Sequence, residues 1–186
     1  MSVPTRKEAY ELLTEYTKSS ALIKHALSVE SAMRFYAHKL EGDVEYWGAV
    51  GLLHDFDYER YPSLDDHPFR GAEILREKGY DEDFIDAILS HADHTGVART
   101  TAAQKALFAV DELCGFVTAV TLVRPSKKLE DVRPKSVSKK LKDKAFARAV
   151  SRSDIDEGAK LLDLDLPEHI ANVIEAMQRV APQLGL

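Results

Sequence analysis

Apolar residues recur every three or four positions along most of the chain, which is the spacing of one face of an α-helix. Helix-capping residues, prolines and glycines divide the pattern into segments. The predicted helices begin at Thr5, Ser20, about Val44, His67 and Asp81, and the later ones cover about 102–123, 154–163 and 168–182. No useful length of chain alternates between apolar and polar residues as a half-buried strand does. We therefore predict an all-α fold, a compact bundle of eight or nine helices forming a single domain over residues 1–186.

Composition narrows the class of protein without changing this prediction. The 186 residues are 45% hydrophobic and include only 9 Gly and 7 Pro, which excludes collagen-like and low-complexity chains. No apolar run approaches the roughly 18 residues that a membrane span needs. The start of the sequence has early charges and lacks the apolar core of a signal peptide. With a single cysteine, Cys114, no internal disulfide can form, so we expect a cytoplasmic protein without membrane partners.

Charge is distributed unevenly along the chain. Residues 124–148 hold ten Lys/Arg and three acidic residues, a formal charge of +7 within a total of −6, which leaves −13 for the rest. An acidic body of this size opposes binding to a phosphate backbone, so a nucleic-acid partner is not expected. Two interpretations of the basic segment stay open: a local flap that holds a small anion, and a solvated helix and loop rich in lysine.

Ligand-type residues occur within apolar helices, where they are unexpected. Between Ala106 and Val123 the only charged side chains are those of Asp111 and Glu112. A buried unpaired carboxylate costs several kcal/mol, so Asp111 needs a cation or strong donors, and a buried salt bridge is one way to supply them. His54-Asp55 ends a second apolar helix, and His25 lies on the inward side of a third. Convergence of three helices on such residues favours a metal site.

Further histidines extend this candidate set. His67 stands at the start of the fourth predicted helix, and His91 stands at the end of the fifth. His94 follows three residues later, close enough to contact the same site. Imidazole and carboxylate ligands together suit divalent first-row metals such as Mn, Fe, Co, Ni or Zn, and Mg remains a further candidate.

The order His25, His54-Asp55, Asp111 resembles the metal-binding pattern of the HD-domain superfamily of metal-dependent phosphohydrolases. The segment GLLHDFDY is similar to the family signature, and His67 in HPFRGAEIL and His91 in ILSHAD match the two additional histidines of its dinuclear branches. The core resemblance covers about residues 20–123, with the basic segment 124–148 and the C-terminal helices expected to pack on it. The sequence departs from the usual Ile-Gly after His-Asp, where Phe56-Asp57 stands, and Tyr58 replaces a lysine of the cyclic-dinucleotide phosphodiesterase branch.

The resemblance implies hydrolysis of a small phosphorylated metabolite or nucleotide by metal-activated water, with one or two divalent metals per chain. The implied metal ligands are His25, His54, Asp55, His67, His91 and Asp111, with Asp55, His94 and Asp57 in catalysis. The basic segment suggests Arg124, Lys127, Lys128 and Lys135 as phosphate ligands. Arg124 lies about 20 Å along a straight helix from Asp111, so this role requires the segment to fold back over the site.

Two other functions stay open at this point. HD-fold mixed-valent di-iron oxygenases keep a similar order of ligands, so spacing discriminates poorly between them and the hydrolases. A non-catalytic nucleotide-binding module that uses the basic segment as an interface is the other alternative. The intact set of ligands argues against such a module, because a sensor has no need for an open catalytic metal.

Overall fold

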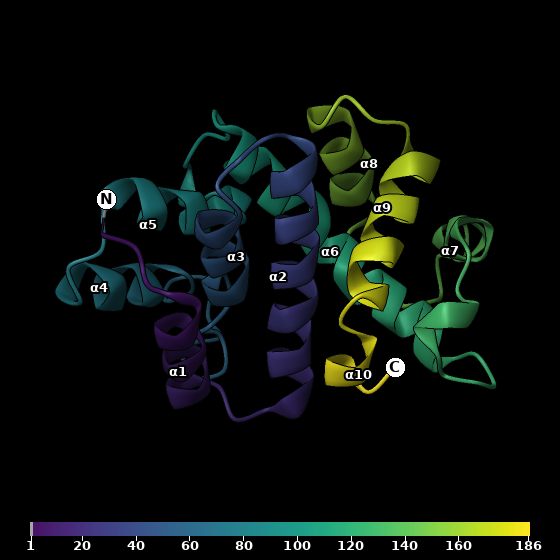
Figure 1. The fold of residues 1–186 in the computed structure, drawn as a ribbon, viewed down its shortest axis with the longest axis horizontal. Helices are drawn as coiled ribbons and strands as arrows, with labels where there is room; N and C mark the ends of the chain where they lie inside the picture. The colour runs from purple at the N-terminus through teal and green to yellow at the C-terminus, as the bar shows by residue number, and fades with distance from the viewer. Residues whose placement is uncertain (1) are drawn as a thin grey trace.

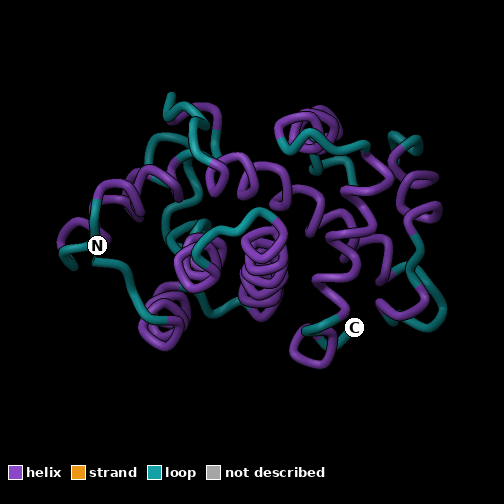
Figure 2. Tube along the Cα trace, turned by 45° about the horizontal axis from the view of Figure 1, so that its top comes forward, coloured by secondary structure: helices purple, strands orange, loops and turns teal. Residues whose placement is uncertain are grey.

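The computed structural model describes residues 2–186, and in that range the chain is entirely helices and loops (Figure 2). The α-helices are α1 (Arg6–Tyr16), α2 (Ser20–Lys39), α3 (Val44–Leu53), α4 (Phe69–Glu77), α5 (Glu82–Leu89), α6 (Ala102–Leu122), α7 (Pro134–Leu141), α8 (Arg152–Leu161), α9 (Leu166–Gln178) and α10 (Ala181–Leu184). Short 3-10 turns cover Asp93–Thr95 and Leu129–Asp131. The predicted all-α class is confirmed. The structure divides the helix predicted over about 168–182 into α9 and α10, and it forms the short α7 within the basic segment.

Side-chain caps explain where several helices begin. Thr5 and Glu8 form a reciprocal capping box at the start of α1, and Thr101 and Gln104 do the same for α6. The cap of α2 is Ser19 and not Ser20, because the Ser19 hydroxyl accepts the backbone N–H of Leu22. These caps satisfy backbone donors that have no partner within the helix.

The long helix α2 lies at the centre of the molecule, with α1 and α3 on one side and α6 and α9 on the other (Figure 1). Its buried face includes Val29 and Met33, which are 0% exposed. Gly51 of α3 lies against this face, where an added Cβ would come within 3.1 Å of the Glu30 Cα. This close approach brings the C-terminal end of α3 next to α2, which matters for the site below.

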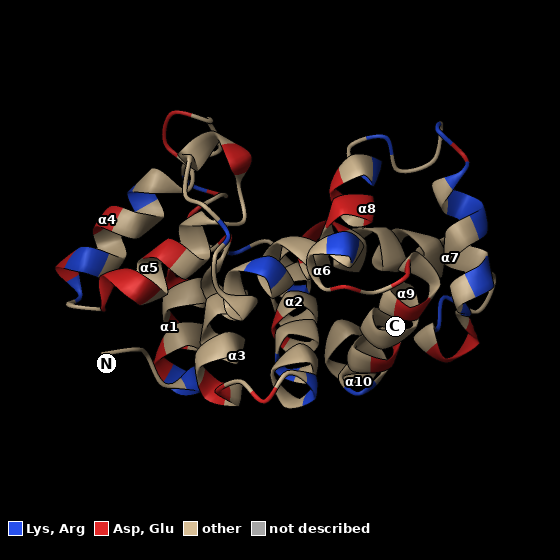
Figure 3. Ribbon diagram, turned by 90° about the horizontal axis from the view of Figure 1, so that it is seen from above, with Lys and Arg blue, Asp and Glu red and all other residues tan. Residues whose placement is uncertain are grey.

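The C-terminal third of the chain packs beside α6. Helices α8 and α9 both contact α6, and α7 contacts α9. The lysine-rich α7 lies at the end of the molecule opposite α4 and α5 (Figure 3). Across residues 2–186, none of the helices combines the length and the apolar character that crossing a membrane requires.

Candidate metal centre

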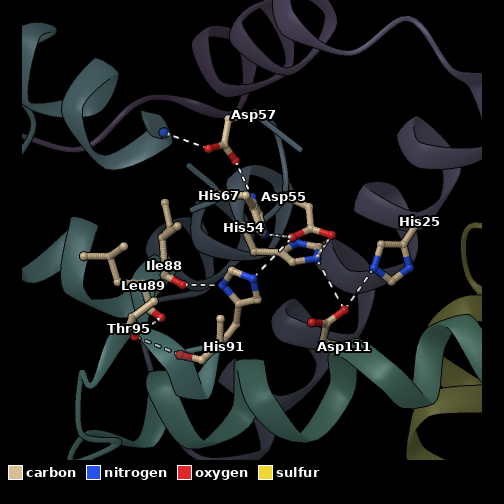
Figure 4. Close-up of polar contacts among 12 residues, drawn as sticks. His25, His54, Asp55, Asp57, His67, Ile88, Leu89, His91, Thr95 and Asp111 are labelled. Carbon is tan, nitrogen blue, oxygen red and sulfur yellow. Dashed lines mark hydrogen bonds and ion pairs between the residues drawn. The ribbon is translucent and has the colours of Figure 1, made fainter. Parts of the chain in front are cut away.

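Six side chains from five parts of the fold converge on one centre (Figure 4). Long helices supply two of them, His25 from α2 and Asp111 from α6. The other four stand at helix ends: His54 and Asp55 directly after α3, His67 shortly before α4, and His91 shortly after α5. Convergence of these six was predicted from the sequence, and the structure brings all of them together.

The first half of the centre is built on Asp111. Its Oδ1 lies 3.0 Å from His25 Nε2 and 3.4 Å from His54 Nε2. His54 is fully buried, whereas the His25 and Asp111 side chains are 23% and 20% exposed. This half is therefore closed on the side of α3 and open towards solvent on the side of α2 and α6.

Asp55 joins this half to a second one. Its Oδ2 lies 3.5 Å from His54 Nε2, while its Oδ1 lies 3.2 Å from His67 Nε2 and 3.3 Å from His91 Nε2. The ligand atoms of His25, His54 and Asp55 all lie within 4.8 Å of one another, and so do those of Asp55, His67 and His91. The Asp55 carboxylate thus faces His54 with one oxygen and His67 and His91 with the other.

Hydrogen bonds on the far side of each ring fix how three histidines face the centre. The Nδ1 of His54 donates to the Gly51 carbonyl at 2.8 Å, and the Nδ1 of His91 donates to the Ile88 carbonyl at 2.7 Å. The Nδ1 of His67 bonds to Asp57 at 2.8 Å. Each arrangement directs Nε2 towards the shared carboxylates, which is how proteins orient metal-binding imidazoles.

The pKa shifts of the carboxylates and imidazoles show that the centre favours positive charge. Burial acts to raise the pKa values of Asp55 and Asp111, yet the neighbouring histidines hold both well below their usual range. Burial acts to lower the pKa of His54 and of His67, but Asp55 with Asp111 raises the first to about 10, and Asp55 with Asp57 raises the second to about 9. The two carboxylates therefore favour positive charge on the groups that face them.

One buried atom bears on whether this centre fits a metal. Among the described residues, His54 Nε2 is buried without any hydrogen-bond partner, although it faces Asp55 and Asp111. Buried polar atoms are nearly always satisfied, so an orphan of this kind requires a specific explanation. A divalent cation ligated by imidazole nitrogen and carboxylate oxygen meets both this need and the demand for positive charge. The donor set therefore fits a metal.

The centre opens into a cavity of about 600 Å³. Tyr58, Leu64 and Phe108 form part of its wall, together with the exposed His94. The His94 ring bonds through Nε2 to the His67 carbonyl at 2.9 Å, which leaves Nδ1 as its other ring nitrogen. His94 thus lies at the cavity, where its predicted catalytic role would place it.

The structure places Asp57 behind the centre and not at the cavity. Its side chain is 1% exposed, with one oxygen on His67 Nδ1 and the other accepting the backbone N–H of Gly71 at 2.8 Å. Asp57 does not line the cavity, so its contacts favour a positioning role towards His67, and the predicted proton transfer by Asp57 stays a prediction.

The four basic residues predicted to bind phosphate also lie elsewhere. None of Arg124, Lys127, Lys128 and Lys135 lines the metal cavity. Lys127 and Lys128 line a separate groove, while Lys135 is exposed on α7. Helix α7 of this segment packs against α9 and α6, and no residue of 124–148 lines the metal cavity.

Three acidic residues of the cavity wall, Asp93, Glu112 and Asp154, had not been assigned a role. Glu112 lines the cavity, and burial first, then the charge of Asp111, raises its pKa to about 7. Its position next to Asp111 in an apolar helix was a usable signal. Asp154 of α8 also lines the cavity, but nothing in the local sequence indicates that α8 reaches the site.

Comparison with known families agrees with this geometry. The family model described as HD domain matches residues 22–184, which is nearly the whole chain and includes all six converging side chains. The chain belongs to the HD domain family. Proteins with HD domains are generally metal-dependent phosphohydrolases, and the His/Asp centre is compatible with divalent metal binding.

One curated relative shares part of this HD domain. It is the tRNA (cytidine(56)-2'-O)-methyltransferase of Thermoplasma volcanium, which is 30% identical over 89 residues. The match covers 48% of this chain and 26% of that protein, so the chain spans only about a quarter of the relative's length. No solved structure matches the chain.

Proposed function

We propose that this HD domain is a metal-dependent phosphohydrolase that acts on a small phosphate ester. The observation that carries the proposal is the position of Asp55, whose two oxygens face His54 on one side and His67 and His91 on the other, at the base of an open cavity. A carboxylate shared in this way is suited to two cations. His25, His54, Asp55 and Asp111 would hold one of them, and Asp55, His67 and His91 would hold the other.

Divalent cations bound there would supply positive charge for the phosphoryl oxygens and lower the pKa of water. The cavity makes this contribution necessary, because none of the residues that line it is lysine or arginine. The protein's own groups would orient the ester and exclude bulk water, with Phe108 and Tyr58 in the wall.

Two side chains are placed to move protons. His94 donates through Nε2 to the His67 carbonyl, so Nδ1 is the ring nitrogen left to exchange a proton; it would first take up a proton to form the imidazolium and then pass that proton to the leaving oxygen. Glu112 is a second ionisable group in the cavity wall. Its Oε2 accepts the Ser151 backbone N–H at 3.2 Å, which leaves Oε1 as the oxygen to carry the proton.

A screen of phosphate release tests the proposal. Protein loaded with Mn, Co, Ni or Mg is assayed on phosphomonoesters and phosphodiesters of small metabolites and nucleotides. We expect release by the wild type and a loss of at least about 100-fold in Asp55→Asn and Asp111→Asn, because each substitution removes a carboxylate charge from the centre. His38→Ala, on the exposed surface of α2, is the matched control.

Other outcomes of the same screen would overturn the proposal. Silence on every ester with every metal would contradict it, and so would equal rates in the wild type and Asp111→Asn. Oxygen consumption by iron-loaded protein without phosphate release would favour the di-iron oxygenase alternative. The methyl transfer named for the Thermoplasma protein is not proposed for this chain, since the matched segment covers only 26% of that protein.

A further inference from the structure

A second cavity adjoins the metal cavity. It has a volume of about 290 Å³ and lies between α2, α6 and the C-terminal residues around α10. His25 and Gly115 line both cavities, so these two residues form the boundary between them. The boundary consists of one metal-centre imidazole and one residue with no side chain.

Neither helix propensity nor close packing explains why residue 115 is a glycine. It lies well inside the 21-residue α6, and glycine is a poor residue for a helix interior. At Gly51 and Gly158, an added Cβ would meet neighbouring backbone within 3.1 Å. At Gly115 an added Cβ meets nothing within 4 Å, so the space beside it is open. The absent side chain therefore leaves the boundary between the two cavities clear.

The second cavity differs from the first in its chemistry. Its wall includes the aliphatic side chains of Ala21, Leu122 and Leu184, with hydroxyl groups from Ser28 and Thr118. No carboxylate side chain lines it, and its basic residues are Lys24 and the shared His25. The metal cavity, in contrast, has carboxylates beyond the proposed ligands, from Asp93, Glu112 and Asp154. Mostly apolar walls with a few hydrogen-bonding groups are typical of sites for organic ligands.

We propose that one ligand occupies both cavities, with its phosphoryl group at the metal centre and an uncharged, mainly apolar organic group beyond Gly115. The inference rests on the proposed function and names its substrate class: esters with a single phosphoryl group and no other anionic group. Further anionic groups would meet the carboxylates of the metal cavity. Gly115 then determines specificity, because a long side chain there, such as leucine, would fill the passage.

The role of the second cavity is tested by calorimetry, which measures how tightly non-hydrolysable phosphonates bind to the manganese-loaded protein without any turnover. Hexylphosphonate and methylphosphonate carry the same head group and differ only in the apolar chain. We expect the wild type to bind hexylphosphonate at least about 10-fold more tightly, as apolar pockets discriminate by this order for small differences in chain length. In Gly115→Leu this ratio is expected to fall towards one. Ala119→Leu adds the same side chain to α6 at a position that lines neither cavity, and its ratio should stay at the wild-type value.

The outcomes separate this inference from the function on which it rests. Equal affinity of the wild type for the two phosphonates would overturn the second cavity as a subsite while leaving the phosphohydrolase proposal intact. An unchanged ratio in Gly115→Leu would overturn the role of Gly115. Failure of both phosphonates to bind, together with no ester hydrolysis, would count against the proposed function itself. The wild-type ratio needs no variant, so it decides the main point even if Gly115→Leu does not fold.

Discussion

The side chain of Asp57 is nearly inaccessible to solvent and divides its two oxygens between the His67 ring and the backbone of Gly71. Together with the carbonyls that hold His54 and His91, it determines which ring nitrogen faces the centre. These contacts set the geometry of the centre as much as the six ligand-type residues do. The resemblance suggested a catalytic role for Asp57, and its contact with His67 was not predicted, because the turn between α3 and α4 that orients it is not visible in the spacing.

Replacing Asp57 with asparagine tests this positioning role. Asp57→Asn removes the negative charge that bonds to His67 Nδ1, so His67 becomes a weaker and less oriented ligand. We expect the affinity for the cation bound by His67 and His91 to fall by roughly 10- to 100-fold, measured as metal content across buffered free-metal concentrations. Asp66→Asn, at a side chain that is 40% exposed, is the control. Unchanged metal content in Asp57→Asn would show that Asp57 does not position His67.

At the scale of elements, the sequence pattern predicted the inward direction of those candidate ligands that belong to strongly patterned helices. His25 and Asp111 lie on apolar helix faces, and His54-Asp55 ends an apolar run, so periodicity alone directed them inwards. The placement of α7 and α8 could not be derived in this way. Their course depends on which surfaces of α6 and α9 they cover, and that is decided by close packing between distant segments such as Gly158 and Ala109.

Two glycine substitutions separate close packing from helix propensity. In Gly158→Ala the new Cβ would lie 2.5 Å from the Ala109 Cα, so α8 and α6 must move apart, and we expect a loss of about 1–3 kcal/mol in the free energy of unfolding. In Gly115→Ala the Cβ meets nothing within 4 Å, so the variant is expected to gain up to about 1 kcal/mol from helix propensity. Urea denaturation of both variants measures the contrast, and destabilisation by Gly115→Ala would show that the space is not open.

At the scale of the whole molecule, His169 links three helices. It is 0% exposed on α9, accepts the Tyr36 hydroxyl of α2 at Nδ1 (2.6 Å), and donates from Nε2 to the Ala109 carbonyl of α6 (2.8 Å). In the sequence, His169 has no ligand-like neighbours, so the local pattern assigned it no role. Its structural role depends on partners that are 133 and 60 residues away, which local pattern cannot predict.

This link predicts that stability falls in acid. Burial lowers the pKa of His169 to about 4, against about 6.5 in the unfolded chain. Below pH 6.5 the unfolded state binds a proton that the native state does not, so the free energy of unfolding decreases between pH 6.5 and pH 4. The maximum loss is about 3 kcal/mol.

Urea denaturation of the wild type and His169→Gln, both with chelator, measures this effect. Chelator keeps metal binding from adding its own pH dependence. We expect the difference in stability between the two proteins to be largest near pH 7 and to shrink by pH 4. A difference that does not depend on pH would show that His169 titrates normally in the native protein.

The two halves of the metal centre are anchored differently. Asp111 lies in the middle of a 21-residue helix and His25 in a 20-residue helix, whereas His67 and His91 stand in turns beside helices of nine and eight residues. Turns open locally at lower free energy than the middle of long packed helices. A cation on the His67 and His91 side should therefore exchange with solution faster than one held by His25 and Asp111. The identity of a cation on the His67 and His91 side would then depend on the most recent buffer. A cation held by His25 and Asp111 would remain the one that the protein acquired during folding.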